Sequence, residues 1–375
     1  MALLTTSNFE LDLDCYPKVN ANIQQPWDAA DLYLIESALF GKQPALINDQ
    51  WGVLTCFLLQ QDRSVYSWSD SFCSQKGIDN NSQKFNYSPS VLTLDEGIPS
   101  FPKDTDSLWI QCPKSFDQLH WWLCQALEQL GSGIEISLAG MAKHLPVKWL
   151  KWLEQHNDDY QQHPITKKAR LMTFKLGDKL PAIKVLKNYP GPDNKNVNAL
   201  PGVFSRDHMD IGSRFFIQQI SQLNTLSGKV IDLGCGNGLL SIACLHHFPT
   251  QVIDLILCDD SSLALQSAKD NLLARDYTTG EFHHTDALLN VGAKVDTILC
   301  NPPFHSGNRI STAAAERMFR QASKLLNKDG QLLVIANRHL PYAPLLKKGF
   351  KNIKQLNSDA KFVVYQCTNA LTASC

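Results

Sequence analysis

The sequence predicts an α/β protein made of two tandem domains, each built on a mainly parallel, doubly wound sheet. Three observations lead to this prediction. The chain has 375 residues, more than one domain usually contains. Its second half alternates short apolar runs with amphipathic runs around a glycine-rich turn at residues 234–238. The first half repeats part of this layout without the glycines.

Composition is that of a soluble protein. Apolar residues make up 44% of the chain and charged residues 19%, and no apolar run approaches the ~20 residues that a membrane-spanning helix needs. Residues 1–14 contain acids but no Lys or Arg, unlike a secretion signal, so we expect a cytoplasmic protein. The 11 cysteines are scattered singly, which favours reduced, mostly buried thiols and no bound metal.

Charge is nearly balanced but unevenly distributed. The net charge of −1 does not by itself favour a nucleic-acid partner. Residues 143–187, however, carry ten Lys or Arg against four acids, and residues 338–361 carry six against one. Two local basic stretches suit a polyanionic partner, although a charged stretch is about as often a solvated surface.

In the first half, apolar residues at helical spacing predict a helix over residues 26–40. A strand over residues 45–49 then ends in a polar turn at Gly52, and an apolar run follows from Val53 to Leu59. This strand, turn and apolar run have the layout of residues 230–245.

Two further segments of the first half correspond to segments of the second. Ser69-Asp70-Ser71 corresponds to Asp259-Asp260-Ser261, and residues 108–114 correspond to residues 298–303. Asp70 precedes Pro113 by 43 residues, and Asp260 precedes Pro302 by 42. Agreement at three points indicates that one α/β domain is present twice.

The first copy lacks the residues of a ligand site. Only Gly52 corresponds to the glycines of the second half, and Gln50 and Trp51 would crowd a ligand. We therefore predict a degenerate domain over residues 1–185 that binds or supports the substrate. The segment 166–174 is expected to be a strand that carries Lys167, Lys168 and Arg170.

Residues 186–200 lie within a stretch rich in proline, Asn and Asp, and we predict a linker there, followed by the second domain over residues 201–375. Its expected elements are helices at 214–223, 236–248, 261–275 and 312–327, strands at 229–234, 252–258, 281–285, 295–300 and 330–336, and a hairpin near 352–367. Ligands of such sheets bind at the carboxyl ends of the strands. Asp232, Asp259, Asp286 and Asn301 are all expected there, which predicts a site at that edge.

The glycine turn predicts a cofactor site. Gly234, Gly236 and Gly238 let a ligand lie against bare backbone, and the following helix offers unpaired N–H groups. Leu239 stands where the dinucleotide fingerprint needs its third glycine, which argues against NAD. Asp232 before the glycines and Asp259 one helix and strand later resemble the S-adenosylmethionine (SAM) site of class I, Rossmann-like methyltransferases.

Residues 301–304, Asn-Pro-Pro-Phe, indicate the chemistry. Pro302 and Pro303 fix φ and donate no N–H, so the turn is stiff and its carbonyls are free to accept. The Asn301 side-chain oxygen and the Pro302 carbonyl can accept both hydrogens of a planar amino group and hold its nitrogen in line with a methyl donor. Phe304 offers a face for a substrate ring, worth roughly 1–3 kcal/mol per stacked base. The motif is similar to that of amino-methyltransferases acting on adenine N6, glutamine amide nitrogen or guanine N2.

A closer resemblance covers essentially the full length. Residues 202–213, 301–305 and 335–342, in this order behind a degenerate duplicate, resemble the bacterial ribosomal RNA guanine-N2 methyltransferases. Residues 27–31 and 167–170 resemble the large-subunit (23S) member more than the small-subunit (16S) member.

This resemblance implies SAM as methyl donor and ribosomal RNA, with a flipped-out guanine, as substrate. It also implies Asp259 on the ribose hydroxyls, Asp286 near the adenine, and residues 301–304 on the guanine. Because Asp260 follows Asp259, spacing alone leaves open which of the two acids holds the ribose.

Residues 202–213 are expected to fold over the cofactor as a lid that includes Phe204, Asp210 and Gly212. A simple helix cap would explain Ser213 but gives Phe204 no role. For the RNA backbone we expect contacts from Lys167, Lys168, Arg170 and, in the second domain, Arg338.

Three other functions remain open from the sequence. They are a 16S ribosomal RNA guanine-N2 methyltransferase, an adenine-N6 or glutamine amino-methyltransferase, and an RNA-binding assembly protein without activity. The internal duplicate argues against the second, and the intact glycines with residues 301–304 argue against the third. We expect a monomer, without a membrane or metal partner.

Overall fold

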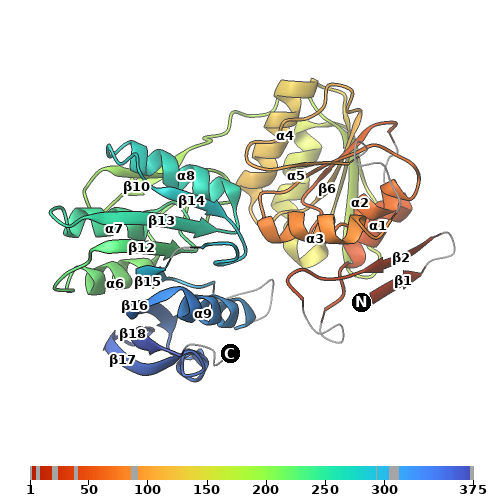
Figure 1. Cartoon of the computed structure of the whole chain (residues 1–375). Coiled ribbons are helices and arrows are strands. Elements are labelled where there is room, and N and C mark those ends of the chain that lie inside the picture. Colours follow the sequence, from red (N-terminus) through yellow and green to blue (C-terminus); the bar gives the residue numbers. More distant parts are fainter. Residues whose placement is uncertain are drawn as a thin grey trace. The chain divides into compact units, whose positions relative to one another are not determined.

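The structure is a computed structural model that describes residues 2–5, 9–18, 24–37, 41–85, 92–292, 294–303 and 312–371. The chain divides into two compact units, Met1–Val185 and Leu186–Cys375 (Figure 1). The described strands form two seven-stranded sheets and two separate two-stranded hairpins. This arrangement confirms the predicted fold class of two tandem α/β domains.

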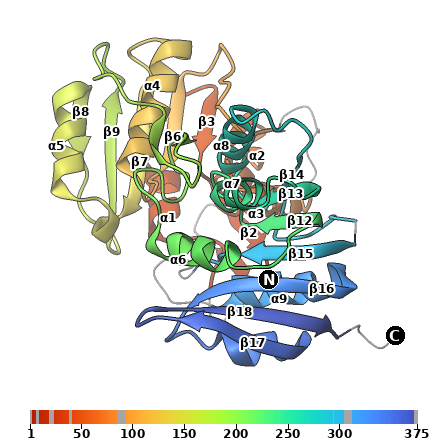
Figure 2. The same cartoon turned by 90° about the vertical axis from the view of Figure 1, so that its left-hand side faces the viewer.

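The sheet of the second unit is parallel except at one edge. Its strands lie in the order β14-β13-β12-β15-β16-β18-β17, which Figure 2 shows one below another. β18 pairs antiparallel with both β16 and β17. The strands are Gly228–Leu233 (β12), Ile253–Asp259 (β13), Glu281–His284 (β14), Val295–Cys300 (β15), Leu326–Asn337 (β16), Phe350–Ser358 (β17) and Phe362–Ala370 (β18). Strand order reverses between β12 and β15, and doubly wound sheets bind ligands at that point, beyond the carboxyl ends.

Helices cover both faces of this sheet because its strands are apolar on both faces. Successive side chains of a strand point to opposite faces, so β12 places Val230 in one core and Ile231 in the other. Helices α6, α7 and α8 pack in the Val230 core, and α9 and α10 pack in the Ile231 core. These helices are Ile211–Ile220 (α6), Leu239–His247 (α7), Ser262–Leu273 (α8), Ala313–Leu325 (α9) and Tyr342–Leu346 (α10).

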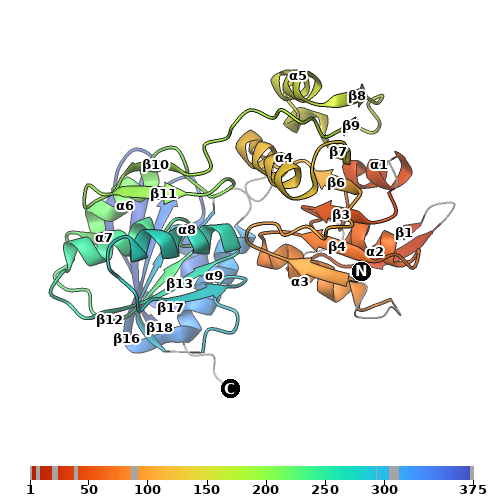
Figure 3. The ribbon, with the colours of Figure 1, turned by 90° about the horizontal axis from the view of Figure 1, so that it is seen from above.

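The first unit repeats this topology. Its strands lie in the order β5-β4-β3-β6-β7-β9-β8, and Figure 3 shows β8 to β4 one below another. The strands are Pro44–Ile47 (β3), Val65–Trp68 (β4), Leu92–Asp95 (β5), Ser107–Gln111 (β6), Glu135–Met141 (β7), Asp158–Gln162 (β8) and Ala169–Lys175 (β9). The helices are Ala29–Ser37 (α1), Val53–Leu59 (α2), Phe72–Ser82 (α3), Phe116–Leu130 (α4) and Val147–His156 (α5), with a short 3-10 turn at Ala142–His144. The duplication that the sequence suggests is therefore present as a fold.

Residues 186–200 do not form the linker that the sequence predicts. Lys187–Pro190 (β10) and Asn196–Ala199 (β11) pair antiparallel as a hairpin. Asn271 of α8 holds this hairpin, because its Oδ1 accepts from the Asn198 N–H and its Nδ2 donates to the Asn198 carbonyl, both at 2.8 Å. Pro190 ends β10 and does not interrupt the pairing, so proline content was a poor guide to a linker here.

The same hairpin opens the first unit. Ala2–Thr5 (β1) pairs antiparallel with Glu10–Leu13 (β2). The N–H of the next residue, Asp14, donates to Asn81 Oδ1, and the Asp14 carbonyl accepts from Asn81 Nδ2, both at 2.9 Å. Asn81 lies in α3, the helix that corresponds to α8, so residues 186–200 are the first element of the second copy.

Other predictions differ from the structure at element ends. Helix α6 begins at Ile211, so Gly212 and Ser213 lie in its first turn, and α7 begins at Leu239 and not at residue 236. The cysteines that the structure describes are all free thiols, and six of the ten are buried. Among the described residues, no helix is long and apolar enough to cross a membrane, and no three metal-binding side chains form a group.

Candidate functional site

Three glycines follow β12, and each adopts a positive φ: 74° at Gly234, 54° at Gly236 and 80° at Gly238. A Cβ on Gly238 would lie 3.2 Å from the Ala268 backbone, so Gly238 lets α7 pack closely on α8. A Cβ on Gly236 would meet no atom within 4 Å. Gly236 therefore serves no packing need, and it is the position where a ligand can approach bare backbone.

Asp232, on β12, is completely buried. Its Oδ2 accepts from the Ser241 N–H at 3.0 Å and from the Ser241 hydroxyl at 2.7 Å, which ties the strand to α7. Its Oδ1 is buried without a hydrogen-bond partner among the described residues. Burial, opposed by the Ser241 hydrogen bonds and reinforced by the nearby Asp259, raises the pKa of Asp232 to about 7. A buried acceptor left unpaired marks a position for a donor from outside the chain.

Asp259 ends β13, the strand beside β12. Its Oδ2 accepts from the Gly236 N–H at 2.8 Å, and its Oδ1 accepts from the Ser261 N–H at 2.9 Å. Asp260 comes after the strand, and its carbonyl faces His284 Nε2 at 2.8 Å. Of the two acids, Asp259 is thus the one that reaches the glycine turn, and the geometry favours it as the ribose ligand.

Asp286 follows β14 and is buried. Its Oδ1 accepts from Arg317 Nη2 at 3.0 Å and from Arg317 Nε at 3.3 Å. The sequence did not suggest Arg317, because a lone arginine in an amphipathic helix has the pattern of a solvated face. The ion pair connects β14 to α9 and fixes the orientation of the carboxylate.

Asn301 directly follows β15. Its Nδ2 donates to the hydroxyl of Ser213, in the first turn of α6, at 3.0 Å. Its Oδ1 is buried and has no hydrogen-bond partner among the described residues. Since the amide nitrogen is fixed by Ser213, the amide oxygen is left as an acceptor for a substrate donor.

Next to Asn301, Pro302 is buried and Pro303 is exposed. The predicted stacking residue, Phe304, lies outside the described residues. The sequence offered no direct signal for the role of Ser213, which was considered only as a helix cap. The helix cap is Asp210, whose Oδ2 accepts from the Ser213 N–H at 2.8 Å.

The predicted lid, residues 202–213, is therefore part loop and part helix. Its end is the first turn of α6, where a Cβ on Gly212 would lie 3.1 Å from the Phe362 ring. Gly212 thus allows α6 to approach β18. Phe204, in the loop before the helix, is 63% exposed, which leaves a large apolar side chain available to cover a bound ligand.

A cavity of about 560 Å³ lies at the same edge of the sheet. It is lined by Asp210, Asn337, Arg338, His339, Ala360, Lys361 and Phe362. Asn337 ends β16 and is 8% exposed, and its Oδ1 is buried without a hydrogen-bond partner in the described part of the chain. Arg338 is exposed and donates to the Asp359 carbonyl at 2.9 Å. Cations beside an unpaired acceptor suit a nucleotide.

Lys167 and Lys168 do not lie on the predicted strand. Their φ values are 48° and 69°, and Thr166 and Ala169 pair across them. Two central residues with positive φ form a tight hairpin turn, which the apparent alternation of residues 166–174 concealed. Only Arg170 lies on β9, and its Nη1 is 3.5 Å from Gln162 Oε1. Both lysines are exposed.

The second unit thus brings together most of the residues that the sequence singles out. Bare backbone at Gly236, the unpaired Asp232 Oδ1 and the carboxylates of Asp259 and Asp286 belong to three adjacent strand ends. These groups fit a ligand with a cationic amino acid part, a ribose and an adenine, and so they fit SAM. The first unit, described by itself, has no equivalent glycine turn.

Models of two protein families match the chain. The RLMG N-terminal domain matches residues 1–178, and the methyltransferase small domain matches residues 194–366. Relatives named ribosomal RNA large subunit methyltransferase G are similar along nearly the whole chain. The one from Alcanivorax borkumensis is 35% identical over 96% of this chain and 95% of its own. The one from Vibrio parahaemolyticus is 36% identical over 96% and 94%.

Among solved structures, the T. Thermophilus 16S rRNA N2 methyltransferase RsmC, in complex with AdoMet and guanosine, has a similar fold. The TM-score is 0.78 over 98% of this chain and 97% of that one, at 18% sequence identity. The similarity covers both units, so the fold of each unit is shared, and not only the fold of the second.

Proposed function

The chain belongs to the family of ribosomal RNA large subunit methyltransferases G, and from this premise we propose that it methylates the exocyclic N2 of one guanine in 23S ribosomal RNA. The observation that carries the proposal is Asn301, whose amide nitrogen is held by Ser213 while its amide oxygen is buried and unpaired within the described residues. That oxygen can accept a hydrogen from an amino group but cannot donate one.

The cofactor is S-adenosylmethionine, which supplies an electrophilic methyl group. We assign its binding to Gly234, Gly236 and Gly238 of the turn, Asp232, Asp259 and Asp286 at the strand ends, and Phe204, Asp210, Gly212 and Asn301 beside them. Asp259 takes the ribose hydroxyls, since it is the acid that contacts the glycine turn. Asp286 lies on the adenine side, with its carboxylate oriented by Arg317.

Positioning does most of the catalytic work. The lone pair of the guanine amino nitrogen is delocalised into the ring, so the free amine is a poor nucleophile. Asn301 Oδ1 and the Pro302 carbonyl accept its two hydrogens and direct the lone pair out of the ring plane. Pro303 stiffens the turn, and Phe304 stacks on the base. Such orientation, established before reaction, contributes several kcal/mol.

A strong base is unnecessary in this mechanism. SAM would supply the methyl group, whose bond to the sulfonium sulfur would break as its bond to N2 forms, leaving a neutral thioether. N2 would then carry a positive charge and be acidic, and its proton would leave to solvent. The chain then needs only to hold the amine and exclude competing water. The complete burial of Asp232 and its hydrogen bonds to Ser241 support a binding role rather than a proton-transfer role.

The target base must leave its stack to reach Asn301. The cavity of about 560 Å³ at Asn337, Arg338 and Lys361 is placed to receive the nucleotide beside it, with the phosphate on the cations. The first unit keeps the fold without the glycine turn, and we propose that it binds RNA through Lys167, Lys168 and Arg170 and supports the catalytic unit.

Mapping of modified nucleosides tests this function. Ribosomal RNA from cells that lack the gene is incubated with the purified protein and labelled SAM, and fragments are mapped by mass. We expect one N2-methylguanine in 23S ribosomal RNA. Label in 16S ribosomal RNA would instead support the small-subunit activity, and N6-methyladenine or a labelled protein would support the other amino-methyltransferases. No label on any of these substrates would overturn the proposal.

A further inference from the structure

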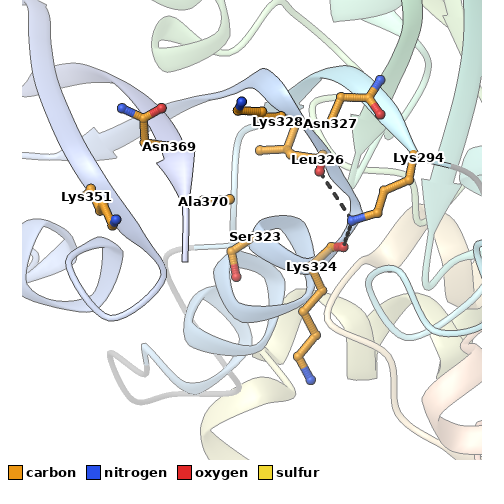
Figure 4. A pocket seen from close by; sticks show the side chains of 9 residues that line it. All are labelled: Lys294, Ser323, Lys324, Leu326, Asn327, Lys328, Lys351, Asn369 and Ala370. Carbon is orange, nitrogen blue, oxygen red and sulfur yellow. Dashed lines mark hydrogen bonds between the residues drawn. The ribbon is translucent and has the colours of Figure 1, made fainter. Parts of the chain in front are cut away.

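The second unit has another cavity, of about 730 Å³, at the opposite end of the sheet from Asn301. It is lined by Lys294, Ser323, Lys324, Leu326, Asn327, Lys328, Lys351, Asn369 and Ala370 (Figure 4), and we call it the lysine pocket. Lys294 precedes β15 and Leu326 begins β16, so the pocket lies at the amino ends of these parallel strands.

Distance separates the lysine pocket from the catalytic edge. Lys294 and Asn301 bracket the whole of β15. At a rise of roughly 3.3 Å per residue, these positions are about 23 Å apart. A ligand in the lysine pocket therefore cannot be the SAM or the guanine of the proposed reaction.

The electrostatics of the pocket favour an anion. Four lysines and no acid line it among the described residues. Asp296 on β15 is not among the lining residues, but it lies beside them, because its Oδ1 accepts from Asn327 Nδ2 at 2.6 Å; its Oδ2 accepts from the Lys229 N–H at 2.9 Å. Even with this carboxylate and with Asp329 next to Lys328 in the chain, the four lysines leave a net positive charge.

The carbonyls at the end of α9 are also neutralised. Lys294 Nζ donates to the Lys324 carbonyl at 2.6 Å and to the Leu326 carbonyl at 3.3 Å, as the dashed lines in Figure 4 show. This contact offsets the partial negative charge of a helix carboxyl end. Within the part of the chain that the structure describes, Lys324, Lys328 and Lys351 form no ion pair, whereas the exposed Lys348 pairs with Glu316 at 2.6 Å.

The lining also selects among anions. It contains no aromatic side chain in the described residues, so it offers no stacking surface for a base. Lysine acts as a point charge and suits phosphate oxygens without reading sequence. The two asparagines and the buried Ser323 add only short polar groups to the lining. Backbone phosphate is therefore the ligand chemistry that the pocket fits.

We propose that the lysine pocket binds backbone phosphates of the RNA about 23 Å from the target base, as a second anchor for a long substrate. This proposal rests on the proposed function for the identity of the polyanion. It predicts that RNA affinity depends on the pocket only when the RNA is long enough to extend from the catalytic edge to the opposite end of the sheet.

The test uses the full-length protein and the double variant Lys328→Ala/Lys351→Ala. Figure 4 shows Lys324 extending away from the other lysines, so Lys324 is left unchanged. The matched control is Lys195→Ala/Lys269→Ala, which removes the same charge from two exposed lysines of the same unit. Binding of a labelled ribosomal RNA fragment and of a labelled trinucleotide is followed by fluorescence anisotropy at several salt concentrations.

For the long RNA we expect the pocket variant to bind on the order of tenfold more weakly than the control at low salt. Its salt dependence should also be lower by roughly one to two units, since each phosphate contact contributes about 0.7 to 0.9. Affinity for the trinucleotide and for SAM should be unchanged. Lys328→Arg/Lys351→Arg should restore binding of the long RNA, because arginine also binds phosphate.

Equal long-RNA affinity and salt slope in the pocket and control variants would overturn the proposal. So would lysine-dependent binding of inorganic phosphate, measured by calorimetry, with unchanged RNA affinity, since the ligand would then be a small phosphate. Because anisotropy measures RNA binding without turnover, these outcomes do not depend on which base is methylated. Failure of the nucleoside mapping is thus distinguishable from failure of the pocket.

Discussion

In both units, the turn that follows the central strand (β3 in the first unit, β12 in the second) begins at the same position relative to the neighbouring strand. Ile47 lies opposite Trp68 of β4, and Leu233 lies opposite Cys258 of β13. The residue after each has a positive φ, 68° at Asn48 and 74° at Gly234. The helices α2 and α7 then begin after Gly52 and Gly238, whose φ values are 88° and 80°. The backbone path is preserved, so the two turns differ in their side chains.

One side chain closes the turn of the first unit. Gln50 stands where the second unit has Gly236, the glycine whose missing Cβ faces open space. Gly52, like Gly238, is needed for packing, because a Cβ there would lie 2.9 Å from the Ile78 backbone. The duplicate thus keeps the glycine that packing requires and has lost the one that a ligand requires.

A buried carboxylate beside the turn, Asp49 in the first unit and Asp232 in the second, also differs between the units in its free acceptors. Asp49 Oδ1 accepts from the Gly52 N–H at 3.0 Å, and Asp49 Oδ2 accepts from the Thr55 N–H at 2.9 Å and hydroxyl at 2.8 Å. Both oxygens are satisfied inside the domain. Asp49 stands at the position of Cys235 and not of Asp232, but Asp232 makes the same pair of bonds to Ser241, the residue that corresponds to Thr55, and keeps Oδ1 unpaired among the described residues. A carboxylate with a structural role has donors for both oxygens within its domain, whereas a carboxylate that binds a ligand keeps one oxygen as a free acceptor.

The residues at the carboxyl ends of β6 in the first unit and β15 in the second make a structural contact in both units but a proposed substrate contact only in the second. Gln111 occupies the ladder position that corresponds to Asn301, since Ile110 pairs with Ile47 and Cys300 pairs with Leu233. The Gln111 amide donates to the buried Asp31 of α1, and the Asn301 amide donates to Ser213 of α6. Both amides are anchored on the helix that precedes the sheet, but only the second is followed by two prolines.

The largest expected effect comes from Asn301→Ala. Removing the acceptor leaves the guanine amine unaligned, and loss of one such aligned group costs on the order of 100- to 1,000-fold in turnover. SAM affinity should be roughly intact, because the lost oxygen faces the guanine amine more than the cofactor and the other SAM contacts remain. Single-turnover methylation of RNA and SAM calorimetry measure the two quantities. Gln111→Ala is the matched control and should retain activity. Turnover of Asn301→Ala within about tenfold of the parent would remove Asn301 from the mechanism.

The next largest effect concerns SAM binding itself. Gly236→Gln places in the second unit the residue that the first unit has, at a φ of 54° and in the space reserved for ligand. We expect SAM affinity to fall at least 100-fold by calorimetry. The parent should bind one SAM per chain, and Gln50→Gly should not create a second site, because Ser69 stands where the second unit has Asp259. A stoichiometry of two in either protein would contradict the comparison.

These contrasts show what the sequence could and could not reveal. Period-two and helical apolar patterns predicted strands β12 to β18 and helices α6 to α9 to within a few residues, because each strand and helix buries a face, but they did not predict α10. Asp232, Asp259 and Asn301 could be predicted as a site because parallel strand ends meet at one edge. The duplicate was predicted from spacing alone.

What the sequence missed depends on contacts between distant segments. Ser213 and Arg317 act on Asn301 and Asp286 across 88 and 31 residues of chain, and no local pattern reports such pairs. The hairpin at 187–199 was hidden by its prolines, and the turn at Lys167 and Lys168 by an accidental alternation. The first error came from composition and the second from an apparent period of two, and neither reports backbone hydrogen bonding.

The two buried acids also give different pH dependences. Because burial raises the pKa of Asp232 to about 7, it is protonated in the empty site below that pH. SAM is a cation and favours the carboxylate, so SAM affinity should fall about tenfold per pH unit below 7. Asp232→Asn should abolish this dependence, and Asp49→Asn should leave it unchanged. Calorimetry from pH 5.5 to 8.5 provides the measurement, and a flat parent profile would contradict the assignment.

Stability should change in the opposite direction with pH. The folded-state pKa of Asp232 lies above the usual value of 3.8, so the folded chain holds a proton that the unfolded chain releases between these values. The stabilisation is therefore complete below about pH 4 and is lost as pH rises towards 7. Asp232→Asn should reduce this slope in urea denaturation without SAM.

The smallest expected effect tests what the duplicate does in place of binding SAM. If Lys167, Lys168 and Arg170 contact RNA phosphates, alanine at all three weakens RNA binding and lowers the salt slope by roughly two to three increments of about 0.7. Arg170 is half-buried on β9, so most of the change should come from the exposed turn lysines. SAM affinity should not change. The matched control is Lys42→Ala/Lys103→Ala/Lys114→Ala, three exposed cations of the same unit. A salt slope equal to that of this control would mean that the turn is only a solvated surface, and the duplicate would then support the fold without holding the substrate.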